Sequence, residues 1–219
     1  MPQSPARKVA VLVGSLRKDS FTRKVANTLT SLAPDSLSFE FIEIGQLPLY
    51  NPDLEASLPA GWVTFRDRMR AMDAVLFATP EYNRSVPGAL KNAIDVGSRP
   101  REKNVFNGKP GAVISVSPGA ISGFGANHHL RQMLVFLNVP TMQQPEAYIG
   151  GVGKLFDRER PAHQRLDERL PQGFYRGFFE VDRAHTRLSN RRQESGGRGR
   201  GQKKTERRKT LRFFRQAAA

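Results

Sequence analysis

A short apolar run near the N-terminus limits the fold more than any other feature of this sequence. Val9 to Val13 are all apolar, and the run ends at Gly14. Such a run, short and without polar alternation, is typical of a parallel β-strand that is buried on both faces. The apolar spacing from Phe21 to Leu32 predicts a helix directly after it, which Pro34 ends. This order of strand and helix indicates an α/β domain.

The strand–helix alternation continues to about residue 150. Further strands are predicted at residues 39–44, 74–78, 111–116 and 139–142, and further helices around residue 65, over 87–95 and over 130–137, with a proline-rich loop at 47–59. Repeated strand–helix–strand units predict a doubly wound parallel sheet with right-handed crossovers. Ligands of such sheets bind beyond the carboxyl ends of the strands. We therefore expect the functional residues in the loops after the first, third and fourth strands.

Composition excludes several classes of protein. No apolar run approaches the roughly 20 residues of a transmembrane helix, and the run before Gly14 is too short for a secretory signal, so a cytoplasmic protein without a membrane partner is predicted. The absence of cysteine excludes disulfides, thiolate catalysis and Cys-ligated metal sites. The adjacent His128 and His129 are not predicted to bind a metal, because neighbouring residues on a helix point about 100° apart.

The net charge of +15 is concentrated in the last third of the chain. Residues 1–150 hold 16 Lys and Arg against 12 Asp and Glu, whereas residues 151–219 hold 19 against 8. Residues 190–219 combine this charge with few apolar residues, so we expect a disordered Arg/Lys/Gly-rich tail. Non-specific nucleic-acid binding through this tail is therefore an alternative function, distinct from any activity of residues 1–157.

The loop after the first strand carries groups that suit a phosphate. Ser15, Ser20 and Thr22 offer hydroxyls, and Arg17 offers a guanidinium. The helix that begins near Ser20 adds free N–H groups, and such helix termini bind anions. The loop matches neither the Walker A pattern nor the dinucleotide fingerprint. An ordinary turn with Ser20 as N-cap and a solvated Arg17 fits the same residues, so both interpretations stay open on this segment alone.

The other two loops are less specific by themselves. The loop Thr79 to Ser85 could line a flat aromatic ligand with Tyr82 and with backbone groups, or it could be a strand-to-helix turn in which Tyr82 covers the core. After the fourth strand, the glycines at positions 119, 123 and 125 allow a ligand to approach the backbone closely, but they could equally serve a turn.

Two strings in these loops occur together in one family of enzymes. The first is Gly14-Ser15-Leu16-Arg17 with Ser20-Phe21, and the second runs Pro80-Glu81-Tyr82-Asn83, Ser85, Pro87-Gly88, Leu90-Lys91-Asn92-Ala93 and Asp95. With Ser117 and His129-Leu130-Arg131-Gln132, they resemble the NADPH-dependent FMN reductase family, a flavodoxin-like group that includes bacterial chromate and quinone reductases. The resemblance covers residues 8–156. It implies a five-stranded parallel sheet in the order 2-1-3-4-5.

The resemblance also implies the chemistry. The enzyme would pass hydride from NADPH or NADH through bound FMN to quinones or other small acceptors, chromate included. The residues that would hold FMN are Ser15, Arg17, Ser20, Phe21, Thr22, Pro80, Glu81, Tyr82, Asn83, Ser117 and Gly119. Thr22 stands where the family usually has asparagine, so it keeps a hydroxyl but lacks a donor amide.

The flavin carries the hard chemistry in such an enzyme, so the resemblance implies no catalytic acid or base and no metal. A homodimer or homotetramer is implied as well. A flavin-binding redox sensor or electron carrier with little turnover is a second alternative, which uses the same residues.

The resemblance stops at Asp157. Relatives end in an amphipathic helix that covers the sheet, whereas residues 158–189 continue here with an Arg-rich sequence of another kind. Dropping one base from plausible codons for residues 158–183 gives a sequence of the family's type, and we interpret this ending as a shifted reading frame. Residues 158–189 are then expected to be an aberrant or makeshift helical segment. A sheet face without its helix should be partly exposed, which lowers stability.

Overall fold

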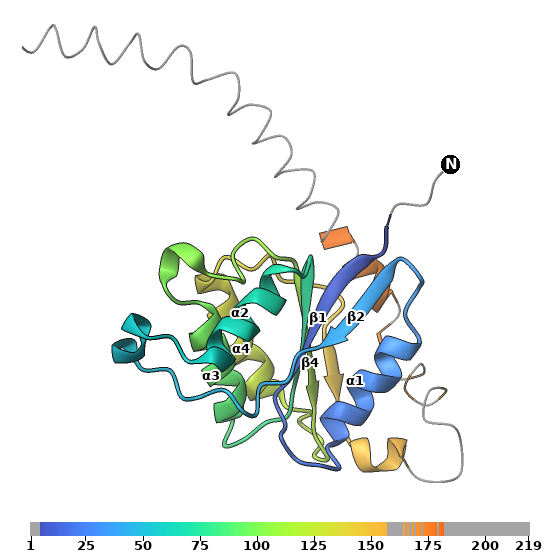
Figure 1. Ribbon diagram of the computed structural model, residues 1–219. Helices are drawn as coiled ribbons and strands as arrows, with labels where there is room; N and C mark the ends of the chain where they lie inside the picture. Colours follow the sequence, from blue (N-terminus) through green and yellow to red (C-terminus); the bar gives the residue numbers. More distant parts are fainter. Residues whose placement is uncertain are drawn as a thin grey trace, which may run out of the picture. The chain divides into compact units, whose positions relative to one another are not determined.

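Five parallel strands form one sheet in the order β2-β1-β3-β4-β5 (Figure 1). The computed structural model describes residues 5–156, 164, 166, 168, 170, 171, 173–178, 180 and 181. The strands are β1 (Arg7–Val13), β2 (Leu37–Phe41), β3 (Ala74–Thr79), β4 (Gly111–Val116) and β5 (Ala147–Ile149). The strand order and the parallel pairing confirm the predicted flavodoxin-like α/β class.

The helices cover the sheet on both faces. They are α1 (Phe21–Ser31), α2 (Ala60–Arg70), α3 (Gly88–Gly97) and α4 (Phe124–Phe136), with short 3₁₀ turns at Pro52–Ala56, Arg101–Lys103 and Val152–Leu155. Helix α1 lies on one face, and α2, α3 and α4 lie on the other (Figure 1). Alternate residues of β1 enter the two cores, Val9 and Val11 toward α1, Ala10 and Leu12 toward α2. No helix in the described part of the chain has the length and apolarity to cross a bilayer.

The fifth strand is not where the sequence predicted it. Residues 139–142 contribute a single parallel bridge, between Thr141 and Gly111, and β5 begins only at Ala147, opposite Ile114. Pro140 and Pro145 have no N–H to donate, so a continuous ladder through these residues is not possible. The prediction of a strand at 139–142 was therefore wrong, and the chain bulges away from the sheet before β5 forms. At the other edge, the pairing of β2 with β1 ends at Phe41, opposite Val11.

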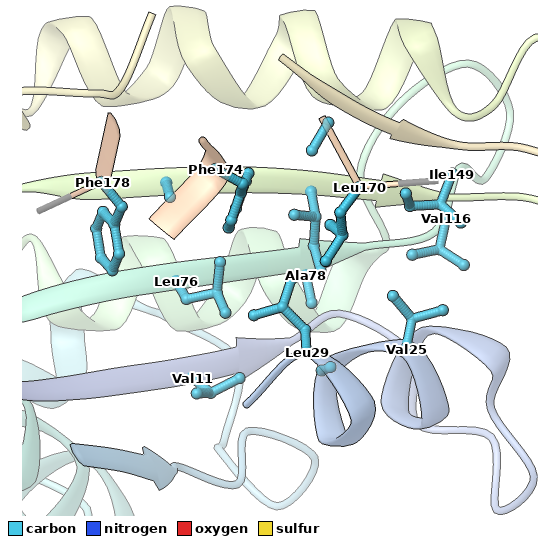
Figure 2. Close-up of a cluster of buried hydrophobic side chains, with 14 of the residues drawn as sticks. Val11, Val25, Leu29, Leu76, Ala78, Val116, Ile149, Leu170, Phe174 and Phe178 are labelled. Atoms are coloured by element: carbon cyan, nitrogen blue, oxygen red, sulfur yellow. The ribbon is translucent and has the colours of Figure 1, made fainter. Parts of the chain in front are cut away.

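The described residues near the C-terminus cover the α1 face of the sheet. Leu166, Leu170, Phe174 and Phe178 are each at most 8% exposed. They belong to the same cluster as the side chains of α1 and β3 (Figure 2). The four side chains recur at every fourth residue, although positions 168, 170, 171 and 173 are not helical. These side chains occupy the sheet face that was predicted to be partly exposed.

Only part of the predicted helical segment at 158–189 is described. Residues 174–178 are helical, and the hydroxyl of Tyr175 donates a hydrogen bond to the carbonyl of Leu29 on α1. Asp157, much of 158–189 and all of the tail at 190–219 lie outside the described residues. The domain boundaries, the shifted frame and the disorder of the tail remain predictions.

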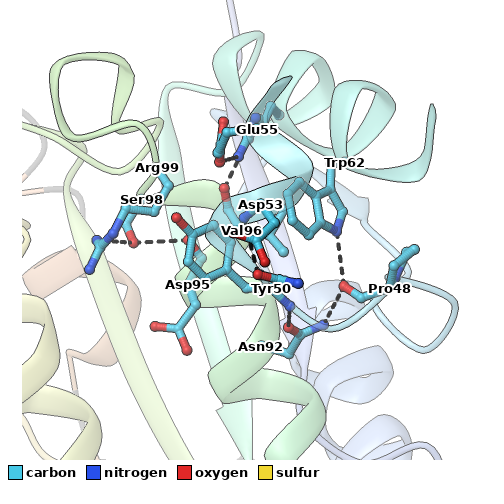
Figure 3. A network of polar contacts seen from close by, with 12 residues as sticks. Pro48, Tyr50, Asp53, Glu55, Trp62, Asn92, Asp95, Val96, Ser98 and Arg99 are labelled. Atoms are coloured by element: carbon cyan, nitrogen blue, oxygen red, sulfur yellow. Dashed lines mark hydrogen bonds and ion pairs between the residues drawn. The ribbon is translucent and has the colours of Figure 1, made fainter. Parts of the chain in front are cut away.

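A buried polar network fixes the proline-rich loop between β2 and α2 (Figure 3). Asn92 on α3 accepts a hydrogen bond from the N–H of Tyr50 at 2.8 Å and donates to the carbonyls of Leu47 and Pro48. The indole N–H of Trp62 also donates to the carbonyl of Pro48, at 2.9 Å. Because side chains pair with these backbone groups, residues 47–50 are ordered although they form no helix or strand.

Replacing Phe178 by Ala should lower the free energy of unfolding by about 3–5 kcal/mol, because the change removes a buried ring and leaves a cavity. Leu49→Ala is the matched control: Leu49 is 78% exposed, whereas Phe178 is 2% exposed. The control should stay within about 0.5 kcal/mol of the parent. Urea unfolding followed by circular dichroism measures both. Equal unfolding midpoints for the two variants would contradict the packing of Phe178 on the sheet.

Candidate functional site

A cavity of about 280 Å³ opens at the carboxyl edge of the sheet, at the loops after β1, β3 and β4. Its wall is formed by Ser15, Arg17, Ser20, Phe21, Thr22, Pro80, Glu81, Tyr82, Val116, Ser117, Pro118 and Val152. The strand order reverses between β1 and β3, and open α/β sheets bind their ligands at this switch point. Every predicted site residue except Asn83 and Gly119 lies in the wall.

The loop between β1 and α1 forms the polar end of the cavity. The hydroxyl of Ser20 caps α1 by accepting the N–H of Arg23 at 3.2 Å. No acidic residue lies in the first turn of α1, so nothing in the helix neutralises its positive end. The guanidinium of Arg17 is exposed and has no ion-pair partner among the described residues. The two interpretations of this loop are therefore compatible: Ser20 is an N-cap, and the charge of Arg17 is available to an anion.

Gly14 brings the first two loops together. A Cβ atom at position 14 would lie 3.3 Å from side-chain atoms of both Pro80 and Leu90, which is tighter than most contacts of real Cβ atoms. The N–H of Gly14 donates to the carbonyl of Ala78 on β3 at 2.8 Å. Only a residue without a side chain allows this approach without displacing its neighbours. Arg17 and Tyr82 thereby come to lie in the wall of one cavity.

Tyr82 begins a two-residue hairpin turn. The N–H and C=O groups of Tyr82 and Ser85 pair reciprocally, at 2.9 and 3.0 Å. Asn83 and Arg84 between them have φ values of 51° and 64°, the left-handed pair of a type I′ turn. Asn83 therefore stands at the exposed tip of the hairpin rather than in the cavity wall.

The loop after β4 closes the opposite side. The hydroxyl of Ser117 accepts the N–H of Gly119 at 3.1 Å, so Gly119 lies beside the wall residue and its N–H is already engaged. Three wall residues were not identified from the sequence: Val116, Pro118 and Val152. Val116 and Pro118 are the chain neighbours of Ser117, and this adjacency could have identified them as wall residues. Val152 comes from the segment after β5 and has no comparable signal.

A second polar cluster lies at the edge of the sheet, on β5 and α4. The hydroxyl of Tyr148 donates to Oε1 of Glu146 at 2.9 Å and lies 3.1 Å from Nε2 of His128. Burial, together with the hydrogen bond to Glu146 and the charge of its carboxylate, raises the pKa of Tyr148 to about 12. The ring of Phe124 packs on His128, with their centroids 4.1 Å apart. None of these residues lines the cavity.

The fold and the cavity define a class: flavodoxin-like α/β proteins with a cavity at the switch point of the sheet. The sequence model of the NADPH-dependent FMN reductase family matches residues 7–154. The chain belongs to this family. The predicted family and the predicted oxidoreductase class, with FMN as cofactor and NAD(P)H as co-substrate, are thereby confirmed.

Individual relatives agree with the family match. A quinone reductase of Pseudomonas putida is 60% identical over 175 residues, which cover 76% of this chain and 94% of the relative. A 2-hydroxy-1,4-benzoquinone reductase of a Burkholderia species is 49% identical over 144 residues, 66% of this chain and 79% of that one. The solved structure of FerB, a flavoenzyme NAD(P)H:(acceptor) oxidoreductase from Paracoccus denitrificans, superposes with a TM-score of 0.74 at 41% identity and covers 82% of this chain and 99% of its own.

Proposed function

We propose that this chain binds FMN in the cavity at the carboxyl edge of the sheet and passes hydride from NAD(P)H to quinones. The observation that carries the proposal is the convergence of Arg17, the start of α1 and Tyr82 on one cavity. The relatives named as quinone reductases support the class of acceptor. A cytoplasmic location is part of the proposal and rests on the sequence.

The residues present fit the phosphate of a flavin nucleotide. Ser15, Ser20 and Thr22 are hydroxyl residues that are 8%, 3% and 2% exposed, and all three line the cavity. A phosphate dianion there would accept hydrogen bonds from these hydroxyls and from the free N–H groups that begin α1. The guanidinium of Arg17, which has no ion-pair partner in the described part of the chain, would bind two phosphate oxygens at once. Thr22 offers a hydroxyl at the position where the family usually has an amide.

The remaining wall would orient the ring system. Pro80, Glu81, Tyr82 and Ser117 line the cavity beyond its polar end. When bound, FMN supplies the hydride chemistry that no side chain can perform. Of the residues that the structure describes, the ionisable ones in the cavity wall are Arg17, Glu81 and Tyr82, and none is a histidine. The protein's own contribution is therefore binding and orientation, as the resemblance implies.

The phosphate site can be tested through Arg17. Arg17→Ala should weaken FMN binding about 10- to 150-fold, because a charge-assisted hydrogen bond to phosphate is lost. Arg70→Ala, which removes a partly exposed arginine from α2, is the control and should leave the affinity unchanged. Calorimetric titration of FMN and of riboflavin, which lacks the phosphate, makes the comparison. Equal affinities of the parent protein for FMN and riboflavin would refute the phosphate site.

Turnover distinguishes an enzyme from a redox sensor or carrier. NADPH or NADH should bleach the absorbance of the bound flavin, and a benzoquinone should restore it, with ping-pong steady-state kinetics because both substrates use one site. Reduction without sustained NAD(P)H oxidation in the presence of quinone would favour the carrier. The nucleic-acid alternative depends on residues 190–219, which lie outside the described residues, and the comparisons do not favour it.

We further propose that the chain forms a homo-oligomer through the outer surface of α4. Val135 and Phe136 on this helix are 74% and 67% exposed, which is unusual for large apolar side chains that lie next to each other. They adjoin a groove of about 340 Å³ between α3 and α4, whose wall includes the ion pair of Lys91 with Asp95. Across a twofold axis, Lys91 of one copy could meet Asp95 of the other, because such an interface is self-complementary.

Phe136→Glu should therefore convert the oligomer to a monomer, since it places a charge in an apolar contact. The mass measured by light scattering reports the change. Val63→Glu on α2 is the control, because Val63 is 41% exposed and lies away from the α3–α4 groove. A monomeric parent protein, or an oligomer that survives Phe136→Glu, would contradict the proposed interface.

A further inference from the structure

The hairpin that begins at Tyr82 is attached to α4 by three contacts. Oε2 of Glu81 accepts the N–H of Ala126 at 3.1 Å. The hydroxyl of Ser85 and Nδ1 of His129 share a hydrogen bond of 3.1 Å. Between these two, the carbonyl of Arg84 lies so close to Gly125 that a Cβ atom there would be 2.7 Å from it. The hairpin therefore packs against the first turns of α4.

Both carboxylate oxygens of Glu81 are engaged within the protein. Oε1 accepts a hydrogen bond from Arg84 at 3.0 Å, and the Glu81 side chain is only 12% exposed. Helix α4 begins at Phe124, and the N-cap position before it is Gly123, which has no side chain to cap the helix. The Glu81 carboxylate thus takes the place of an N-cap, where it satisfies a first-turn donor and favours the positive end of the helix.

The backbone of the hairpin needs such support. Asn83 and Arg84 are both left-handed, a conformation that asparagine tolerates but that arginine disfavours. A strained turn persists only where contacts from outside hold it. The contacts with α4 are of this kind, and the turn that they hold carries Tyr82, a wall residue of the cavity.

We propose that Glu81 and His129 are positioning residues of the flavin cavity, which act by fixing the Tyr82 hairpin on α4. Glu81 acts through Ala126, and His129 acts through Ser85, which does not line the cavity. This inference rests on the proposed function. It assigns both residues the role of holding the hairpin in place, which is separate from any contact with the cofactor.

Flavin affinity in solution tests the role of Glu81. Glu81→Ala should raise the FMN dissociation constant about tenfold, because the hairpin loses its bond to α4. Glu81→Gln should restore affinity to within about threefold, because the amide oxygen still accepts the N–H of Ala126. Asp67→Ala is the matched control: Asp67 and Arg70 form an i,i+3 ion pair on α2 as Glu81 and Arg84 do in the hairpin, but away from the cavity. Quenching of flavin fluorescence by the apoprotein gives all four constants.

The contact between Ser85 and His129 is tested by a double-mutant cycle. Ser85→Ala and His129→Ala should each weaken FMN binding about threefold, and the double variant should be no weaker than either single one, because the two side chains share one bond. The ratio of FMN affinity to riboflavin affinity should stay as in the parent, since the phosphate end of the cavity is unchanged. A general loosening of the protein would lower this ratio. Melting temperatures of the apoproteins verify folding, and if Glu81→Ala does not fold, the other variants decide.

The outcomes separate the two proposals. A parent protein that does not bind FMN refutes the proposed function. A parent protein that binds FMN while Glu81→Ala, Ser85→Ala and His129→Ala bind it equally well overturns the positioning role alone. Additive effects in the double-mutant cycle, or failure of Glu81→Gln to recover affinity, would overturn it as well.

Discussion

The parallel pairing of β1 with β3 is the constraint on which the rest of this structure depends. The register places Val13 opposite Ala78, so the loops that follow both strands leave the sheet at the same edge. Because β2 lies on the far side of β1 and β4 on the far side of β3, helices on opposite faces diverge from this point and leave the edge open. Gly14 then lets the loops close to van der Waals contact. A cavity at this position follows from the strand order before any side chain is chosen.

The side chains at this edge divide two tasks between them. The loop before α1 gathers hydroxyls, a guanidinium and an uncompensated helix terminus, all of which favour an anion. In the loop after β3, by contrast, the charged groups are paired within the protein. Glu81 accepts hydrogen bonds from the backbone of α4 and from Arg84. The loop before α1 thus has charge available for a ligand, whereas the charges of the loop after β3 compensate each other or α4. This asymmetry favours a ligand with a charged end and a larger neutral part.

The sequence predicted features that depend on local pattern and missed those that depend on distant contacts. Continuous apolar runs located β1, β3 and β4, because a strand buried on both faces must be apolar throughout. The prediction of a strand at 139–142 was wrong because apolar character does not show whether backbone N–H groups are present, and Pro140 and Pro145 have none. The family resemblance supplied the site residues, but not the tip position of Asn83, which is set by a left-handed backbone. The bond between Glu81 and Ala126 joins residues 45 positions apart, and no periodicity reveals it.

The end of the chain shows that covering a sheet face requires less specificity than building a site. Cores accept many apolar sequences of suitable volume, so four large side chains at a spacing of four residues can pack where relatives place an amphipathic helix. The two glycines and the proline among residues 170–178 weaken any continuous helix there, and Gly177 lies close against the carbonyl of Gln144, where a larger residue would collide. Among the described residues, none after Val152 lies in the cavity wall. The described side chains that cover the α1 face therefore lie apart from this wall, and substitutions among them are expected to act on the cavity through stability rather than through contact.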